Sequence, residues 1–363
     1  MIPRMKPRAR DLGVPFDGTP GPLNAIADVA GVTVGHVTLN SGSGTHAVRT
    51  GITAVFPRGN ANHDRVFAAT YSLNGNGEMT GVLWVEESGH LGTPVLITNT
   101  HSVGVVRDAV IEWSLQHGIR EGYNGDFSLP LVGETWDGFL NDISGFHVKK
   151  EHVFAVLDGA RGGAVAEGNV GGGTGMVTHE FKGGIGTSSR VLPENDGGYT
   201  VGVLVQSNYG RRELLTVAGV PVGKELTDLM PSEGKAAHGD GSIIVVVATD
   251  APLLPHQLKR LVKRAALGLA VAGGRAENTS GDIFIAFSTA NGENARMTGV
   301  ASLEMLPNER ISPLFRATAD ATTEAIVNAL VAAETMTGLN GNTVHALPHD
   351  GLRDVLRKYN RLA

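Results

Sequence analysis

The sequence contains no cysteine among its 363 residues. This absence excludes disulfide bonds, thiolate metal sites and a cysteine nucleophile together. Positive charge is also sparse: 30 Lys and Arg against 36 Asp and Glu give a net charge of −6 without a basic stripe, so nucleic acid is not an expected partner. No apolar stretch is long enough to span a bilayer, and no signal-peptide core follows the basic residues 1–10. We therefore expect a globular, cytoplasmic protein that does not bind membranes.

Glycine, in contrast, is abundant, with 50 residues. The densest stretch is the segment 162–175, which could suggest a phosphate-binding loop. It lacks the Gly-Lys-Ser/Thr ending of such a loop and leads into the strand-like segment 176–181 rather than into a helix. The segment is more typical of close backbone packing, or of an active-site wall that needs positive φ angles.

The most informative feature is the junction between Gly241 and Ser242. A polar stretch, Ala236-Ala-His-Gly-Asp-Gly, ends there, and Ser242 begins the apolar run that continues through Ile243–Thr249. A glycine turn entering a strand explains this pattern in ordinary structural terms. If the chain instead cleaves itself at this junction, Ser242 carries both a hydroxyl nucleophile and a free amine that titrates near neutral pH.

The segment 224–241 before this junction has no clear periodicity. Loops this long in compact domains are usually functional or disordered. We therefore predict an exposed linker over 224–241, where self-cleavage is sterically possible.

Most other elements have the pattern of short strands bounded by Gly, Asn and Asp. The predicted strands are 82–85, 94–98, 129–134, 153–157, 199–206 and 283–288. Amphipathic helices are predicted over 103–117 with Ser102 as the N-cap, over 257–272 and over 321–333. Strands predominate before Ser242 and helices after it, which favours stacked sheets flanked by helices.

An ordered set of motifs resembles the L-aminopeptidase/D-esterase and β-aminopeptidase family, from about Gly13 to Pro348. The motifs are Asn24-Ala-Ile-Ala-Asp, Gly31-Val-Thr-Val-Gly-His, Asn74-Gly-Asn-Gly-Glu-Met-Thr-Gly, Asn99-Thr-His-Ser-Val-Gly, Glu134-Thr-Trp-Asp-Gly, Gly168-Asn-Val-Gly-Gly-Gly-Thr-Gly-Met, Ser207-Asn-Tyr-Gly, Gly239-Asp-Gly-Ser and Ser280-Gly-Asp. Each motif is weak alone, but the ordered set is highly specific.

The resemblance implies an α+β fold, a four-layer αββα sandwich similar to N-terminal-nucleophile hydrolases but with different connectivity. It also implies a single domain over 1–363 that cleaves itself before Ser242 into an α subunit, 1–241, and a β subunit, 242–363. The family is commonly assembled from several such αβ pairs, so a homo-oligomer is expected. The expected activity is that of a serine aminopeptidase or amidase acting on short peptides, amides or esters.

The resemblance further assigns Ser280 and Asp282 to the support of the nucleophile Ser242. Residues spaced i and i+2 on an extended strand project to the same side, so a serine anchored by a carboxylate is geometrically possible. The acid at this position of the family is often Glu, and the resemblance does not establish whether the shorter Asp282 side chain reaches Ser280. Without the resemblance, Ser280 and Asp282 have the pattern of an ordinary polar turn.

Three more residues complete the predicted site. The Asn208 amide is suited to stabilise an oxyanion, although Asn208-Tyr-Gly also fits a turn after a strand. Glu134 is predicted to bind the substrate ammonium, because a buried ammonium without a partner is costly; this role rests mostly on the resemblance. Trp136 is expected either to wall the pocket or to belong to the core.

Other chemistries fit less well. Glu86, Glu87 and His90 give a single Glu-x-x-His motif, which cannot build a di-iron bundle, and no His-Glu-x-x-His occurs, so we expect no metal and no cofactor. His238 is close to Ser242 in sequence, but cleavage would leave it on a freed tail, which is unsuited to a general base. Two alternatives stay open: a same-fold amidase acting on ω-amino or nylon-type oligomers, and a non-catalytic binding protein that keeps the fold.

Overall fold

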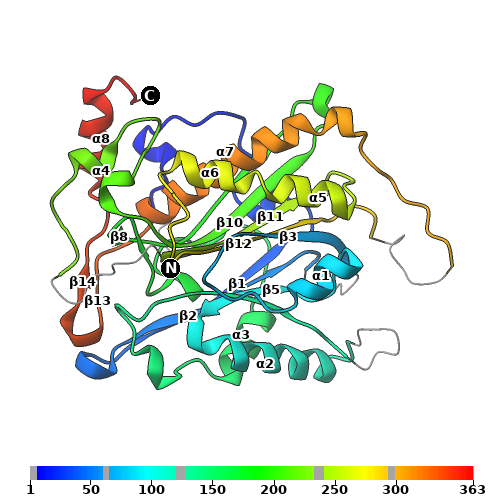
Figure 1. Ribbon diagram of the computed structural model, residues 1–363, viewed down its shortest axis with the longest axis horizontal. Helices are drawn as coiled ribbons and strands as arrows, with labels where there is room; N and C mark the ends of the chain where they lie inside the picture. Colours follow the sequence, from blue (N-terminus) through cyan, green and yellow to red (C-terminus); the bar gives the residue numbers. More distant parts are fainter. Residues whose placement is uncertain (1–5, 60–64, 120–126, 233–240, 293–298, 363) are drawn as a thin grey trace.

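Two stacked β-sheets, each covered on its outer face by helices, form the body of the protein (Figure 1). The computed structural model describes residues 6–59, 65–119, 127–232, 241–292 and 299–362. Helices α5, α6 and α7 lie above the sheets in Figure 1, and α2 and α3 lie below them. The predicted α+β fold with four αββα layers is therefore confirmed.

The larger sheet has six strands in the spatial order β4-β3-β12-β11-β10-β9. Their bounds are β4 His90–Leu91, β3 Val66–Gly75, β12 Gly281–Ser288, β11 Gly241–Thr249, β10 Thr200–Tyr209 and β9 Gly184–Val191. Strands β11 and β12 pair in parallel, whereas the other neighbours are antiparallel. Strand β11, which begins at the predicted cleavage junction, thus has a hydrogen-bonded neighbour on each side.

The smaller sheet has four strands in the order β1-β2-β5-β6. These are β1 Thr33–Ser41, β2 Val48–Phe56, β5 Val95–Asn99 and β6 Leu131–Thr135, and only β5 and β6 are parallel to each other. Two short hairpins accompany the sheets: β7 Val177–Thr178 with β8 Phe181–Lys182, and β13 Met336–Thr337 with β14 Thr343–Val344.

Three apolar layers hold the sandwich together. Helices α5 (Pro255–Val262), α6 (Ala265–Val271) and α7 (Ser312–Val331) pack on the six-stranded sheet, whereas α2 (Val103–Gln116) and α3 (Lys150–Asp158) pack on the four-stranded sheet. The third layer fills the space between the sheets. Helix α1 (Val82–Ser88) contributes Val85 to the layer between the sheets, and α4 (Val222–Glu225) and α8 (His349–Lys358) share a separate apolar cluster.

The position of β11, which is buried on both faces, explains why its sequence is an unbroken apolar run. Successive side chains of a strand point to opposite faces. Ile243 and Val245 pack toward the helices, while Ile244 and Val246 pack between the sheets. Both faces are buried, so both sets of residues are apolar.

Two predicted strands are wrong, because residues 82–85 and 153–157 are helical in α1 and α3. Short apolar runs do not distinguish a strand from a buried helical turn. In α3 the buried Val153, Val156 and Leu157 follow helical spacing. Gly81 and Gly89, both with left-handed φ angles, bound α1. The predicted helix 257–272 is divided between α5 and α6, and the predicted helix 321–333 begins earlier, at Ser312.

The glycine-rich segment 162–175 passes between the two sheets. A Cβ atom on Gly172 would lie 2.8 Å from the Ile97 carbonyl oxygen, and one on Gly173 would lie 2.4 Å from the Ile185 nitrogen. Contacts this close are not tolerated, so glycine permits the backbone to approach the neighbouring strands. Close backbone packing therefore accounts for these glycines.

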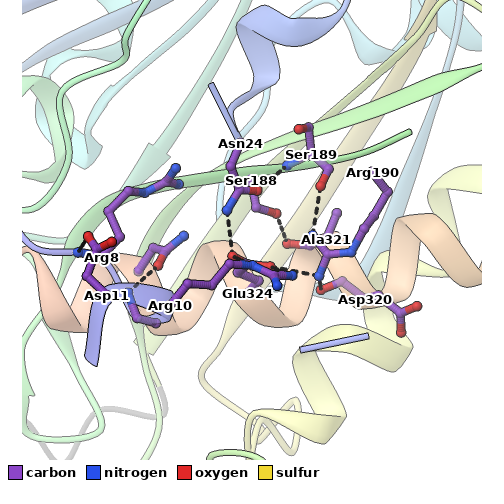
Figure 2. Close-up of polar contacts among 12 residues, drawn as sticks. Arg8, Arg10, Asp11, Asn24, Ser188, Ser189, Arg190, Asp320, Ala321 and Glu324 are labelled. Atoms are coloured by element: carbon purple, nitrogen blue, oxygen red, sulfur yellow. Dashed lines mark hydrogen bonds and ion pairs between the residues drawn. The ribbon is translucent and has the colours of Figure 1, made fainter. Parts of the chain in front are cut away.

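Glu324 on α7 joins the N-terminal segment to the six-stranded sheet (Figure 2). Its side chain is fully buried and forms an ion pair of 2.7 Å with Arg190 and one of 2.8 Å with Arg10. The Asn24 amide donates a further hydrogen bond of 2.6 Å. Burial alone would raise the pKa of Glu324, but the hydrogen bond from Arg10 and the charge of Arg190 outweigh burial and lower it.

We expect Glu324→Gln to lower the free energy of unfolding by about 3 kcal/mol, because it leaves the buried Arg190 without its counter-charge. The lowered pKa means that this stabilisation exists above the unfolded-state pKa and is lost as pH falls through the folded-state pKa. Urea denaturation at pH 7 measures the loss. Glu112→Gln, which removes an exposed partner of Lys150, is the control and should cost less than about 1 kcal/mol. Equal losses in both variants would contradict the assigned role of Glu324.

Candidate active site

Ser242 is the second residue of β11, is buried, and lines a cleft of about 460 Å³. Strand pairing places it opposite Asn208 on β10 and opposite Gly281 on β12. The residues that line the cleft are Asn76, Gly77, Glu78, Thr100, Glu134, Trp136, Asn208, Gly241, Ser242 and Thr279. Within the described residues the Ser242 side chain forms no hydrogen bond, so its hydroxyl is available to a carbonyl group in the cleft.

Gly241 has a left-handed backbone, with φ of +72°. A Cβ atom at this position would lie 2.1 Å from the Asn208 carbonyl oxygen and 2.5 Å from the Tyr209 Cα atom. Only glycine satisfies both the backbone angle and the contact. The residue before Ser242 is therefore bent out of regular strand geometry at the predicted scissile bond.

The Asn208 side chain is held by two hydrogen bonds. Its Oδ1 accepts from the Val177 backbone N–H at 2.8 Å, and its Nδ2 donates to the Trp136 carbonyl at 2.9 Å. These partners determine the orientation of the amide and use one of its two N–H groups. The second N–H remains available, and Asn208 lines the cleft beside Ser242. The geometry suits a pre-organised donor to a negative charge that develops near the Ser242 hydroxyl.

Glu134 places a buried carboxylate at the end of β6, in the same cleft. Oε1 accepts a hydrogen bond of 2.9 Å from the Glu78 backbone N–H, and Oε2 accepts one from the Thr100 hydroxyl. Burial raises the pKa of Glu134, and these two donors counteract that effect. Among the described residues that line the cleft there is no Lys or Arg, so a cation that binds near Glu134 would meet negative charge there.

Trp136 is not a core residue, because 46 % of its surface is exposed. It lines the cleft and contributes the carbonyl that anchors Asn208. Of the two expectations for this residue, the structure agrees with the pocket wall.

Ser280 and Asp282 form a pair in which the Ser280 hydroxyl donates to Asp282 Oδ1 at 2.7 Å. The shorter Asp therefore reaches its serine. Burial raises the pKa of Asp282 to about 6. Asp282 pairs in register with Ile243, which faces the helices, so this carboxylate lies on the opposite face of the sheet from Ser242. The Ser280 and Ser242 side chains therefore lie on opposite faces of the sheet, and their hydroxyls do not contact each other directly.

Several cleft residues were not assigned a role from sequence, namely Asn76, Glu78, Thr100 and Thr279. Three of them lie inside motifs that carry the family resemblance, Asn74–Gly81 and Asn99–Gly104. The motifs marked the segments, but without the sheet geometry nothing indicated which side chains enter the cleft.

The structure describes one of the two alternative chemistries considered from sequence, the Glu-x-x-His motif, but not the one that involves His238. Glu86 binds Lys259 at 2.8 Å and accepts a hydrogen bond from the Thr70 hydroxyl, so it serves as an ion-pair partner on α1. His238 and the rest of 233–240 lie outside the described residues. The described part of the predicted linker, 224–232, is mostly exposed. Among the described residues, no helix is both long and apolar enough to cross a membrane.

Comparison with known proteins identifies the family of this chain. The profile of peptidase family S58 matches residues 24–344. A β-peptidyl aminopeptidase, BapA, of Sphingosinicella microcystinivorans is 54 % identical over 98 % of this chain and 93 % of its own length. A solved β-aminopeptidase from Burkholderia sp. has a TM-score of 0.89 and 49 % identity over 97 % of this chain and 99 % of that one.

A third relative bears on the fold. The L-aminopeptidase D-Ala-esterase/amidase of Ochrobactrum anthropi has a TM-score of 0.91 and 46 % identity, covering 99 % of this chain and all of that one. That structure is described as a prototype for the serine aminopeptidases and a new variant among the Ntn hydrolase fold. The similarity extends over both sheets and over the segments that line the cleft.

Proposed function

This chain belongs to peptidase family S58 and is a serine aminopeptidase, and we propose that Ser242 is its nucleophile and is released by self-cleavage after Gly241. One observation carries the proposal. Ser242 lines the cleft, next to an Asn208 side chain with an available donor, and directly follows a glycine in left-handed geometry. A turn that merely enters a strand does not require these features together.

Self-cleavage begins with attack of the Ser242 Oγ on the carbonyl carbon of Gly241. The C–N bond breaks as the C–O bond forms, the nitrogen takes up the hydroxyl proton, and an ester links Gly241 to the Ser242 side chain. Water hydrolyses this ester and leaves a carboxylate on Gly241 and both a free amine and a hydroxyl on Ser242. The products are an α subunit of residues 1–241 and a β subunit of residues 242–363.

The same hydroxyl then acts on substrate. The α-amine of Ser242, whose unperturbed pKa is about 8, accepts the hydroxyl proton as Ser242 attacks the scissile carbonyl. The leaving amine takes a proton, and water releases the acyl group. Ser280 sits beside Gly281, the register partner of Ser242, so we assign the Ser280–Asp282 pair to holding this amine from the helix-side face of the sheet.

Glu134 is proposed to bind the substrate's N-terminal ammonium, with the exposed Glu78 as a second negative charge in the cleft. We propose β-peptides with a free amine as substrates, and the support is that two closely similar proteins are named a β-peptidyl aminopeptidase and a β-aminopeptidase. A nylon-type amidase without an N-terminal requirement would not need a buried carboxylate at this position.

We expect Glu134→Gln to raise KM for substrates with a free N-terminal amine about 10- to 100-fold, because it removes a charge-assisted contact while keeping size and shape. The kcat should change less, since the ammonium is bound similarly in the ground and transition states. Steady-state kinetics on a β-peptide amide and its N-acetylated form provide the measurement. Glu78→Gln, which removes an exposed carboxylate from the same cleft, should raise KM only a few-fold. Equal rates of the natural enzyme on free and acetylated amides would favour the nylon-type amidase instead.

Assembly into a homo-oligomer of αβ pairs is also proposed. Support comes from apolar side chains on the surface near α1, where Leu83 is 85 % exposed and Phe127 and Leu129 are 45 % and 40 % exposed. Exposed apolar groups that cluster in this way are typical of protein interfaces.

A further inference from the structure

Tyr209 ends β10 and follows directly after Asn208. Its register partner is Gly241, the residue before the nucleophile. Because side chains alternate along a strand, Tyr209 points away from the cleft and packs in the apolar layer between the six-stranded sheet and the helices. Only 4 % of Tyr209 is exposed. The mechanism described above does not use its hydroxyl.

Buried polar atoms on this side of the sheet that lack a hydrogen-bond partner among the described residues include the Tyr209 hydroxyl, Oδ2 of Asp282 and Nε2 of His179, which packs against the Tyr209 ring. A buried hydroxyl or carboxylate oxygen without a partner is costly and is rare in native proteins. An unpaired oxygen on the carboxylate that holds Ser280 is therefore a feature that requires an explanation.

Tyr209 and Asp282 line the same small cavity. Its volume is about 10 Å³, and Ser280 lines it as well. A volume of this size accommodates about one water molecule, provided that the water has two or more polar partners. The Tyr209 hydroxyl, the free oxygen of Asp282 and the Ser280 hydroxyl supply such partners.

We propose that Tyr209 is a positioning residue for the Ser280–Asp282 pair, its hydroxyl binding Asp282 Oδ2 through a single buried water. The inference rests on the proposed function, since it assigns Tyr209 a role through that pair. With Ser280 on Oδ1 and the water on Oδ2, the carboxylate is held at both oxygens. It therefore keeps the Ser280 hydroxyl directed toward the position that the Ser242 amine occupies after cleavage.

The charges around this cavity allow the arrangement. Burial, together with the nearby charge of Asp282, raises the pKa of Tyr209, so its hydroxyl remains protonated and able to donate. His179 packs edge-on against the Tyr209 ring, with 5.0 Å between the ring centroids. Burial lowers the pKa of His179 to about 4, so its imidazole is neutral near pH 7. Arg275 and Glu277 line the cavity from the loop before β12, and Glu277 pairs with Arg211 at 3.5 Å.

The test is the pH profile of kcat for Tyr209→Phe. Burial raises the pKa of Asp282 to about 6, so activity that depends on its ionised form is lost as pH falls through that region. A hydrogen bond to the carboxylate favours the ionised form. Removing the Tyr209 hydroxyl should therefore move the acid limb of the profile to higher pH by about half to one unit. Rates near pH 9 should stay close to those of the natural enzyme.

Tyr71→Phe is the matched control. Tyr71 packs against Phe284 on the same strand as Asp282, but it does not line the cavity. Its profile should coincide with that of the natural enzyme. Thermal melting of both variants shows whether each remains folded. Asp282→Asn should remove the part of the acid limb near pH 6, whereas the part that reflects protonation of the Ser242 amine at higher pH should remain.

The outcomes separate this inference from the proposed function. If the acid limb of Tyr209→Phe coincides with that of the natural enzyme while Asp282→Asn removes the part near pH 6, the role of Tyr209 is overturned and the proposed site stands. If Asp282→Asn also leaves the part near pH 6 in place, the assignment of the Ser280–Asp282 pair is wrong, and the inference is overturned with it. A crystal structure with an ordered water in contact with both Tyr209 and Asp282, together with the shifted limb, supports the inference.

Discussion

Ser242→Ala is expected to remain a single chain of 363 residues and to lose hydrolytic activity by on the order of 10⁴-fold or more. Alanine supplies no oxygen to attack the Gly241 carbonyl, so the ester that precedes cleavage cannot form. Even a chain cut by other means would lack the nucleophile for substrate. Intact-mass measurement of freshly purified protein should give fragments 1–241 and 242–363 for the natural enzyme, the second beginning Ser-Ile-Ile-Val.

Ser288→Ala is the control for this experiment. Ser288 is a buried serine at the far end of β12, where its hydroxyl bonds the Ala251 carbonyl. That variant should mature and hydrolyse substrate, with only a loss of stability. If Ser242→Ala still splits after Gly241, or if the natural enzyme stays intact and nevertheless hydrolyses amides, Ser242 is not the nucleophile of self-cleavage.

The sequence predicted the strand at the junction well, for a physical reason. A buried central strand needs apolar residues on both faces, and Ile243–Thr249 has that pattern bounded by glycine. Residues 153–157 have a similar apolar character but form part of α3. The difference lies in what covers them, because α3 buries one face against the four-stranded sheet. Local pattern alone does not contain that information.

The composition of the site was predicted better than its geometry. The i, i+2 spacing of Ser280 and Asp282 correctly indicated that the two side chains lie on one side of a strand. Which side that is relative to Ser242 depends on the parallel register between β11 and β12. Register across strands that are distant in sequence is set by tertiary packing, so the placement of the pair on the helix-side face could not be predicted.

Glu78 and Tyr209 illustrate the same limit. Glu78 enters the cleft because its backbone N–H is bound by Glu134, a contact between segments far apart in the chain. Tyr209 shares a cavity with Asp282 only because β10 and β12 flank the same central strand. Sequence identifies residues able to do chemistry, whereas the pairing of strands decides which of them meet.

Asn208→Ala is expected to lower kcat by about 100- to 1,000-fold, because an oxyanion donor contributes most in the transition state. KM should change much less. Self-cleavage passes through a similar tetrahedral anion, so the precursor should also mature slowly. Thr178→Val is the matched control: Thr178 anchors β7 to β10 through the Ser207 carbonyl without reaching the cleft, and its loss should change kcat only a few-fold. Steady-state kinetics measure the change in kcat, and mass spectrometry of samples taken over time measures the rate of self-cleavage.

An activated ester separates the role of Asn208 from that of Asp282. Attack on either an ester or an amide places negative charge on the carbonyl oxygen, so the loss from Asn208→Ala should persist on both substrates. Asp282→Asn, in contrast, weakens the proton handling at the Ser242 amine. An amide needs a proton delivered to its leaving nitrogen, whereas an activated ester departs without one. The ester should therefore rescue Asp282→Asn more than Asn208→Ala, and equal losses on the two substrates in both variants would show that at least one of these roles is misassigned.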